Sequence, residues 1–150
     1  MQIEQTRLEQ LMPLIKEALS EGKNVRFFPY GFSMLPMLRQ GLDSVVISPL
    51  AGKLKIYDLP LYQRDNGQYV LHRIVRIGDS YTCIGDNQFI KETDLRYEQF
   101  IGVVTAFYRN DRRVSVHNFT YQLYCRFWHY TRFIRRVWRK IINFIKHSKI

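Results

Sequence analysis

Three short stretches of the chain carry side chains that could take part in covalent chemistry. The first is GFSMLPML, residues 31–38, where Ser33 stands between two large apolar residues and Pro36 follows three positions later. The second is His72 in YVLHRIV, and the third is Asp86 in IGDN. A serine hydroxyl is a weak nucleophile near neutral pH, so it needs a nearby base and donors for the oxyanion. Histidine suits the role of base, and a carboxylate can fix its tautomer.

Each stretch also has a purely structural interpretation when it is taken alone. Ser33 could sit in a tight loop packed by its apolar neighbours, because short motifs give many false matches. Alternation along a strand would place His72 on the same face as Val70 and Ile74, where a histidine is often a hydrogen-bonded structural group. Gly, Asp and Asn are also ordinary turn formers, so GDN predicts a turn in any case.

Taken together, the three stretches resemble the type I signal peptidase and LexA-like superfamily of serine endopeptidases. The pattern of that superfamily is G-x-S-M-x-P, then K-R or H-R on a later strand, then G-D-N. The order and the spacing match, with 39 positions from the serine to the histidine and 14 more to the aspartate. GLDSVVI (41–47), with one residue inserted, and FIGVV (100–104) are similar to two further strands. The resemblance covers residues 22–108.

This resemblance implies a fold and a set of roles. The fold would be mainly β, a twisted and mostly antiparallel domain. Ser33 would be the nucleophile and His72 the base, as in endoplasmic-reticulum and archaeal signal peptidases, whereas the bacterial enzymes usually carry lysine there. Asp86 would complete a Ser-His-Asp arrangement. Gly31, Ser33 and Met34 would form the oxyanion and substrate-binding segment, with the Ser33 N–H as donor and Gly31 in place of a serine found in many bacterial enzymes. No metal or cofactor is implied.

Apolar periodicity predicts the elements that must position these residues. Residues 3–21 have helical spacing, although Pro13 counts against a continuous helix. The turns at 65–67 and 110–112 predict two hairpins. Period-two patterns and turn residues predict strands at 24–28, 44–48, 54–63, 68–77, 81–84, 101–109 and 114–116. We therefore expect a catalytic domain with its N-terminal helix over 1–117 and a long amphipathic helical tail over 118–150.

The net charge lies entirely in that tail. Residues 1–111 contain 13 Lys and Arg against 13 Asp and Glu, whereas residues 112–150 contain 10 Lys and Arg and no acid. A block of this kind predicts an anionic partner. The two cysteines are too few for a disulfide framework. The N-terminus is not a secretory signal and no apolar run is long enough to span a bilayer, so we expect a cytoplasmic, peripherally membrane-associated protein.

Three interpretations compete for residues 118–147. The apolar face could pack on the protein's own domain, the segment could bind nucleic acid through its arginines and aromatics, or it could lie flat on an anionic membrane. We favour the membrane, with Phe127, Tyr130, Trp138 and Ile142 between the headgroups, because aromatic residues suit that interface. Nucleic acid is then not the expected partner.

The sequence as a whole predicts a serine endopeptidase that cleaves a peptide or leader segment. A small precursor peptide that matures at a membrane surface would be a suitable substrate. Two alternatives from other classes stay open. One is a catalytically silent binding or regulatory module on the same fold, since a fold does not guarantee activity. The other is a nucleic-acid-binding protein that acts through the basic tail.

Overall fold

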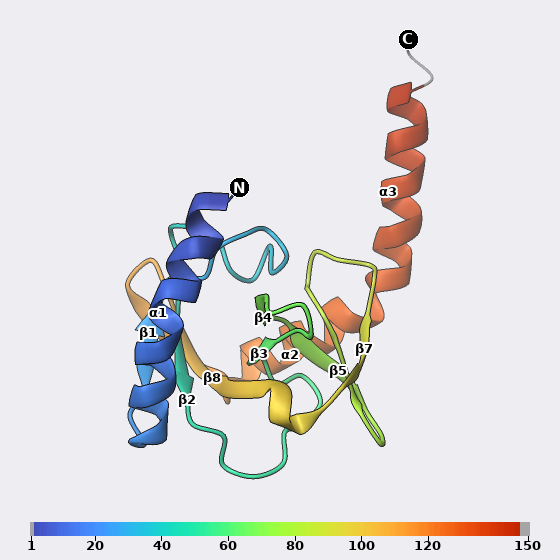
Figure 1. Ribbon diagram of the computed structural model, residues 1–150. Helices are drawn as coiled ribbons and strands as arrows, with labels where there is room; N and C mark the ends of the chain where they lie inside the picture. The colour runs from blue at the N-terminus through green and yellow to red at the C-terminus, as the bar shows by residue number, and fades with distance from the viewer. Residues whose placement is uncertain (1, 148–150) are drawn as a thin grey trace.

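The protein consists of two antiparallel β-sheets with helices at both ends of the chain (Figure 1). A computed structural model describes the backbone of residues 2–147 and the side chains of residues 8–146. The elements are α1 (Gln2–Ser20), β1 (Val25–Phe27), β2 (Ser44–Ser48), β3 (Pro60–Gln63), β4 (Tyr69–Leu71), β5 (Arg73–Ile77), β6 (Tyr81–Ile84), β7 (Glu92–Leu95), the short 3-10 helix η1 (Tyr97–Gln99), β8 (Phe100–Arg109), β9 (Arg112–Ser115), α2 (Phe119–Tyr130) and α3 (Arg132–His147).

The larger sheet is built around the long strand β8. Its order is β1-β2-β8-β3-β4, and β9 pairs with the end of β8. The β8–β9 hairpin turns at Asn110 and Asp111, which both have positive φ angles, as a two-residue hairpin loop requires. The expected hairpins are thus confirmed, since β3 also pairs with β4 across the turn at 64–68. The expected extended segment 54–63 is a strand only from Pro60 onward.

The predicted strand 68–77 is divided between the two sheets. Its first part, β4, pairs with β3 in the larger sheet, whereas its second part, β5, pairs with β6 in the smaller sheet β5-β6-β7. His72 is the residue between them, and the four consecutive residues 71–74 are all buried. Both faces of this short segment are therefore covered by protein, as in a strand that is buried on two sides.

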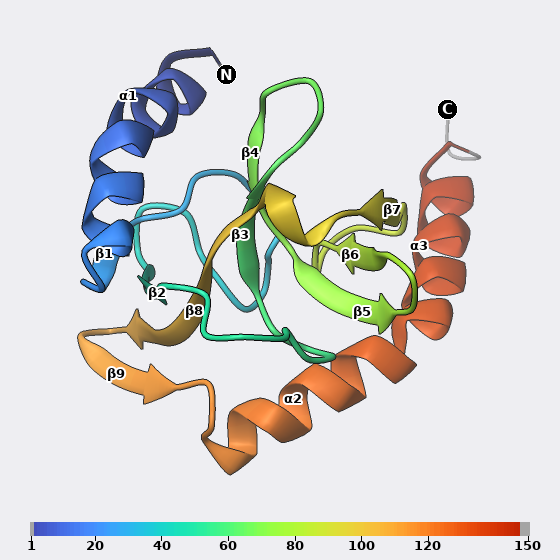
Figure 2. The same ribbon diagram turned by 60° about the horizontal axis from the view of Figure 1, so that its bottom comes forward.

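The main core lies between the larger sheet and the helices. α1 contributes Met12, Ile15 and Leu19, spaced so that they share one face, and Pro13 is accommodated within the continuous helix. α2 closes the core from another side with Tyr121 and Cys125. Figure 2 shows α1 beside the larger sheet and α2 crossing below both sheets. The first half of the predicted tail is thus part of the folded domain.

The single long C-terminal helix expected from the sequence is two helices. α2 ends at Tyr130 and α3 begins at Arg132, and α3 projects from the body of the protein (Figure 1). Thr131 lies at the junction, where its hydroxyl donates to the carbonyl of Phe127. Arg135 stacks on Trp128 and donates from Nη2 to the Trp128 carbonyl, which fixes the direction in which α3 leaves. Among the described residues, no helix combines the length and the apolar character needed to cross a bilayer.

Candidate functional site

Ser33 is held in the loop between β1 and β2, which is anchored at several points. Gly31 has a φ angle of 100°, a conformation that favours glycine, and its N–H donates to Gln40 Oε1 at 3.0 Å. Met34 and Leu38 are buried in the main core, as the apolar pattern of the stretch predicts. Phe32 points outward instead, and 64% of its surface is exposed. The loop therefore fixes the backbone around Ser33 through its neighbours.

The far end of this loop is braced by charged side chains. Asp43 is buried, and its carboxylate accepts hydrogen bonds from the backbone N–H and the guanidinium of Arg39. Burial opposes ionisation of Asp43, but the hydrogen bonds from Arg39 outweigh it and lower the pKa of the carboxyl. Arg109 on β8 donates to the carbonyls of Pro36 and Met37. These bonds tie the loop to the larger sheet.

Ser33 and His72, 39 positions apart in sequence, line the same cavity. Its volume is about 200 Å³, and Gly31, Met34 and Tyr30 lie on its wall. In the described part of the chain no hydrogen bond joins the Ser33 hydroxyl to the imidazole. Catalytic hydrogen bonds are often loose before substrate binds, so this geometry is compatible with a nucleophile and its base.

The imidazole of His72 is positioned by a carboxylate that the sequence interpretation missed. His72 Nδ1 lies 3.0 Å from Oε1 of Glu92, at the start of β7, and 3.3 Å from the hydroxyl of Tyr62. A carboxylate acceptor places the proton on Nδ1, which leaves the lone pair of Nε2 free to accept a proton. The His72 side chain is 2% exposed, so few other orientations are open to it.

Glu92 is kept in its ionised form by a second partner, Arg64. Arg64 Nε donates to Glu92 Oε2 at 2.9 Å, and its Nη2 donates to Oε1. Burial opposes ionisation of Glu92, but the hydrogen bonds from Arg64 and His72 outweigh it, so the pKa of the carboxyl lies well below its usual range. Burial raises the pKa of the Tyr62 hydroxyl, which stays neutral beside the pair. An ionised carboxylate therefore lies against the imidazole of His72.

Asp86 occupies a different place from the one expected. Its buried carboxylate pairs with Arg73, from Nε to Oδ1 and from Nη2 to Oδ2, both at 2.8 Å, and accepts from the hydroxyl of Tyr124 at 3.0 Å. Adjacent residues on an extended chain point to opposite sides, so Arg73 reaches Asp86 while His72 reaches Glu92. The prediction that Asp86 orients His72 is therefore corrected: Glu92 is the carboxylate in contact with the imidazole.

The GDN turn supports the serine loop directly. The N–H of Asn87 donates to the carbonyl of Ser33 at 2.8 Å, and its Nδ2 donates to the carbonyl of Phe32 at 3.1 Å. Gly85 packs so closely that a Cβ there would lie 2.6 Å from the Ser33 carbonyl oxygen. The three motifs thus converge in space, and Asp86 anchors this turn through Arg73. Nothing in the sequence assigned Asn87 this contact.

Two backbone N–H groups of the expected oxyanion segment, those of Ser33 and Met34, make no hydrogen bond within the described residues. The N–H of Gly31 is already bonded to Gln40, so Gly31 contributes a backbone conformation and no donor. The role of the Ser33 N–H as oxyanion donor stays a prediction.

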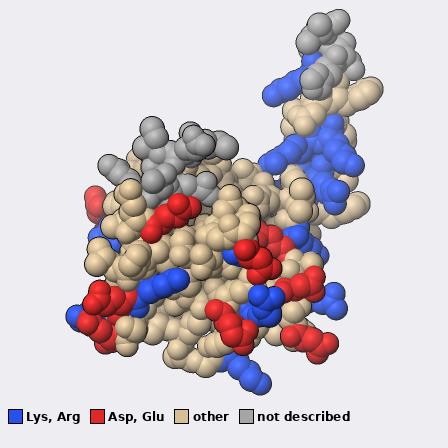
Figure 3. All heavy atoms as spheres, viewed as in Figure 1, with Lys and Arg blue, Asp and Glu red and all other residues tan. Residues whose placement is uncertain are grey.

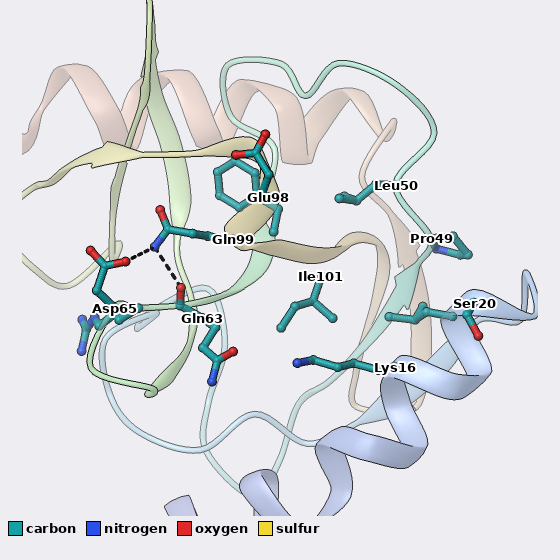
Figure 4. Close-up of a pocket in the computed structure, with 12 residues that line it drawn as sticks. Lys16, Ser20, Pro49, Leu50, Gln63, Asp65, Glu98, Gln99 and Ile101 are labelled. Carbon is teal, nitrogen blue, oxygen red and sulfur yellow. Dashed lines mark hydrogen bonds between the residues drawn. The ribbon is translucent and has the colours of Figure 1, made fainter.

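A larger hollow elsewhere lacks this chemistry. It has a volume of about 580 Å³ and lies between α1 and strands β3 and β8, with Gln99 bonded to Gln63 and Asp65 on its wall (Figure 4). Ser20 also lines it, but its hydroxyl donates to the Glu17 carbonyl and no histidine is on the wall. The smaller cavity is therefore the candidate site.

We expect Asp86→Asn to act on stability. The substitution leaves the guanidinium of Arg73 buried without its counter-charge, and breaking such a pair costs about 3 kcal/mol or more. Burial alone would lower the pKa of the Arg73 guanidinium, but the nearby carboxylate of Asp86 outweighs it and raises the pKa above its usual value. Arg73 therefore stays charged. Urea unfolding followed by circular dichroism measures the loss.

The matched control is Asp79→Asn, an exposed carboxylate in the turn between β5 and β6, for which we expect a change below about 0.5 kcal/mol. Wild-type stability of Asp86→Asn together with an altered pH profile of cleavage would restore the catalytic role that the sequence predicts for Asp86.

Comparison of the chain with protein-family models, with curated proteins and with solved structures finds no significant match. The site is therefore defined by its three motifs and by the contacts described above.

Proposed function

We propose that the protein is a serine endopeptidase of the signal-peptidase and LexA-like type, with Ser33 as nucleophile and His72 as base. The observation that carries the proposal is the cavity that Ser33 and His72 share, with the far side of the imidazole against the ionised Glu92. Nucleophile, base and orienting carboxylate come from three separate segments of the chain. The order and spacing of the motifs support the same reaction class.

The mechanism is acyl transfer. Nε2 of His72 takes the proton of the Ser33 hydroxyl as Oγ attacks the scissile carbonyl carbon, and the Ser33 N–H donates to the oxyanion. The imidazolium, stabilised by Glu92, gives that proton to the leaving amine as the C–N bond breaks. Water then attacks the ester with His72 again as base, and Ser33 leaves with the proton returned to it. The products are a carboxylic acid and an amine.

The cavity favours small side chains next to the scissile bond. Its volume of about 200 Å³ is modest, and Met34, Leu38 and Leu61 form the apolar part of its wall. The expected substrate is a peptide or leader segment with a small residue before the cut, and a precursor peptide that undergoes maturation fits this description.

Active-site labelling tests the proposal. A fluorophosphonate-biotin probe should form an adduct on Ser33, located by tandem mass spectrometry, because only an activated serine reacts at a useful rate. The exposed Ser20 serves as the internal control and should stay unlabelled. Labelling should vanish in His72→Ala. Absence of the adduct in the folded protein, under conditions that label a serine protease standard, would favour a catalytically silent module.

A further inference from the structure

The helix α3 separates its apolar and basic residues without overlap. At 100° per residue, one half of its circumference carries only apolar side chains, and the opposite half carries every Arg and Lys of the helix. The apolar residues Phe133, Ile134, Val137, Trp138, Ile141 and Ile145 are each between 41% and 75% exposed. Ile142, at the edge of the apolar half, is half-buried and lines a hollow against the domain, so it does not share the exposure expected for it. Most of the apolar face of α3 is therefore not packed on the protein's own domain.

α3 contacts the domain through its arginines. Arg135 stacks on Trp128, and its Nη1 donates to the Asp86 carbonyl at 3.4 Å. Arg139 donates to Asn87 Oδ1 at 2.9 Å and lies over the ring of Phe89. In a helix held only by core packing, the apolar side would face the domain. Here Arg135 and Arg139, at one edge of the basic side, face the domain. Most of the apolar face is therefore open to a partner.

The charge of α3 selects that partner. Residues 112–147 contain no Asp or Glu. Figure 3 shows Lys and Arg side chains and no acidic ones along the projecting α3, above a body on which both charges are mixed. A second copy of α3 could cover the apolar face but would offer no anion to the basic side. Nucleic acid would use the basic side alone, and aliphatic residues such as Ile134, Val137 and Ile141 offer no ring for base stacking. An anionic lipid surface can contact both faces of α3 at the same time, because the acyl chains receive the apolar face and the phosphates receive the basic one.

We propose that α3 lies in the interface of an anionic bilayer, with its apolar face between the lipid headgroups and its basic residues at the level of the phosphates. This inference is independent of the peptidase activity proposed above. Asn87, which bonds both to Arg139 of α3 and to the backbone of Ser33, holds the serine loop next to the docked helix. A hollow of about 360 Å³ also lies between Leu35, Pro36 and the Trp138 side of α3. Membrane docking would thus place the candidate site close to peptides at the lipid surface.

The test is co-sedimentation of the full chain with vesicles of equal parts phosphatidylglycerol and phosphatidylcholine. We expect binding in 50 mM salt, weaker binding in 500 mM salt and none to phosphatidylcholine alone. Arg136→Gln with Lys140→Gln removes two exposed charges from α3 and should weaken binding about 30-fold. Ile134→Gln with Ile141→Gln keeps the charge and should weaken binding about tenfold or more.

A matched control separates α3 from the general charge of the chain. Arg112→Gln with Arg113→Gln removes the same charge from exposed positions on β9 and should reduce binding less than the α3 pair does. Trp138 reports insertion: its emission should shift to the blue on addition of vesicles, and the shift should persist in Trp128→Phe and disappear in Trp138→Phe.

Three outcomes would overturn the proposal. The wild-type chain could stay in the supernatant in 50 mM salt. The variant with Ile134→Gln and Ile141→Gln could bind as well as wild type, which would mean that the chain adsorbs by charge alone. The variant with Arg112→Gln and Arg113→Gln on β9 could lose as much binding as the variant with Arg136→Gln and Lys140→Gln on α3. Since these assays do not use peptide cleavage, their failure and that of the proposed peptidase activity are distinguishable.

Discussion

Replacement of Ser33 by alanine is expected to lower peptide cleavage by about 10³-fold or more while the fold stays intact. The hydrogen bond from Asn87 is accepted by the Ser33 carbonyl, which alanine retains, so the loop keeps its support. Only the hydroxyl that would attack the scissile carbonyl is lost. The measurement is the initial rate of cleavage of a mixed peptide library, followed by mass spectrometry, with thermal unfolding of both proteins measured in parallel.

The matched control for this substitution is Ser20→Ala. The Ser20 hydroxyl is exposed and bonds to the Glu17 carbonyl at the end of α1, so its loss should leave the cleavage rate unchanged. An undiminished rate in Ser33→Ala would show that another group carries the reaction, even if the probe labels Ser33.

Local patterns in the sequence predict most of the elements that hold this site. The strand at 44–48 and the strand at 81–84 appear as expected, because each is a short apolar run bounded by turn residues. The serine loop is also predictable, since its buried Met34 and Leu38 and its glycine with positive φ follow from the residue types.

Contacts between distant segments could not be predicted in the same way. Periodicity says which face of a strand is apolar but not which sheet the strand joins, so the change of sheet at His72 is invisible in the sequence. β7 was missed because Glu92, Thr93 and Asp94 are typical of a polar loop, although such residues also protect an edge strand. The residue types around Glu92 therefore give no sign of its contact with His72.

The junction at Thr131 was missed for a related reason. The apolar stripe continues from α2 into α3 with helical spacing, and neither Gly nor Pro marks the break. The change of direction depends on Arg135 stacking on Trp128 and bonding to its carbonyl, which are contacts that only the folded chain reveals. The amphipathic pattern itself was predicted correctly and describes α3 well.

We expect Glu92→Gln to lower kcat/KM by about 10²- to 10⁴-fold, because the substitution removes the charge that stabilises the imidazolium of His72. Since the pKa of Glu92 lies well below its usual range, the carboxylate is ionised throughout the mildly acidic and neutral range. The substitution therefore removes a negative charge and not a neutral acid. The measurement is kcat/KM near neutral pH for wild type and variant.

A charge-conserving variant distinguishes a positioning role from a structural one. Glu92→Gln keeps the length of the side chain but removes the negative charge beside His72 and leaves Arg64 without its partner. Glu92→Asp keeps the charge and should recover part of the rate that Glu92→Gln loses.

Glu98→Gln is the matched control, because Glu98 is an exposed carboxylate on η1 close in sequence, and its cleavage rate should equal that of wild type. If Glu92→Gln and Glu92→Asp lost the rate equally and both lowered the thermal stability, the carboxylate would merely support β7, and the imidazole would be oriented by Tyr62, its other neighbour at Nδ1. If Glu92→Gln left kcat/KM unchanged, Glu92 would not position a catalytic His72, although the two side chains lie 3.0 Å apart.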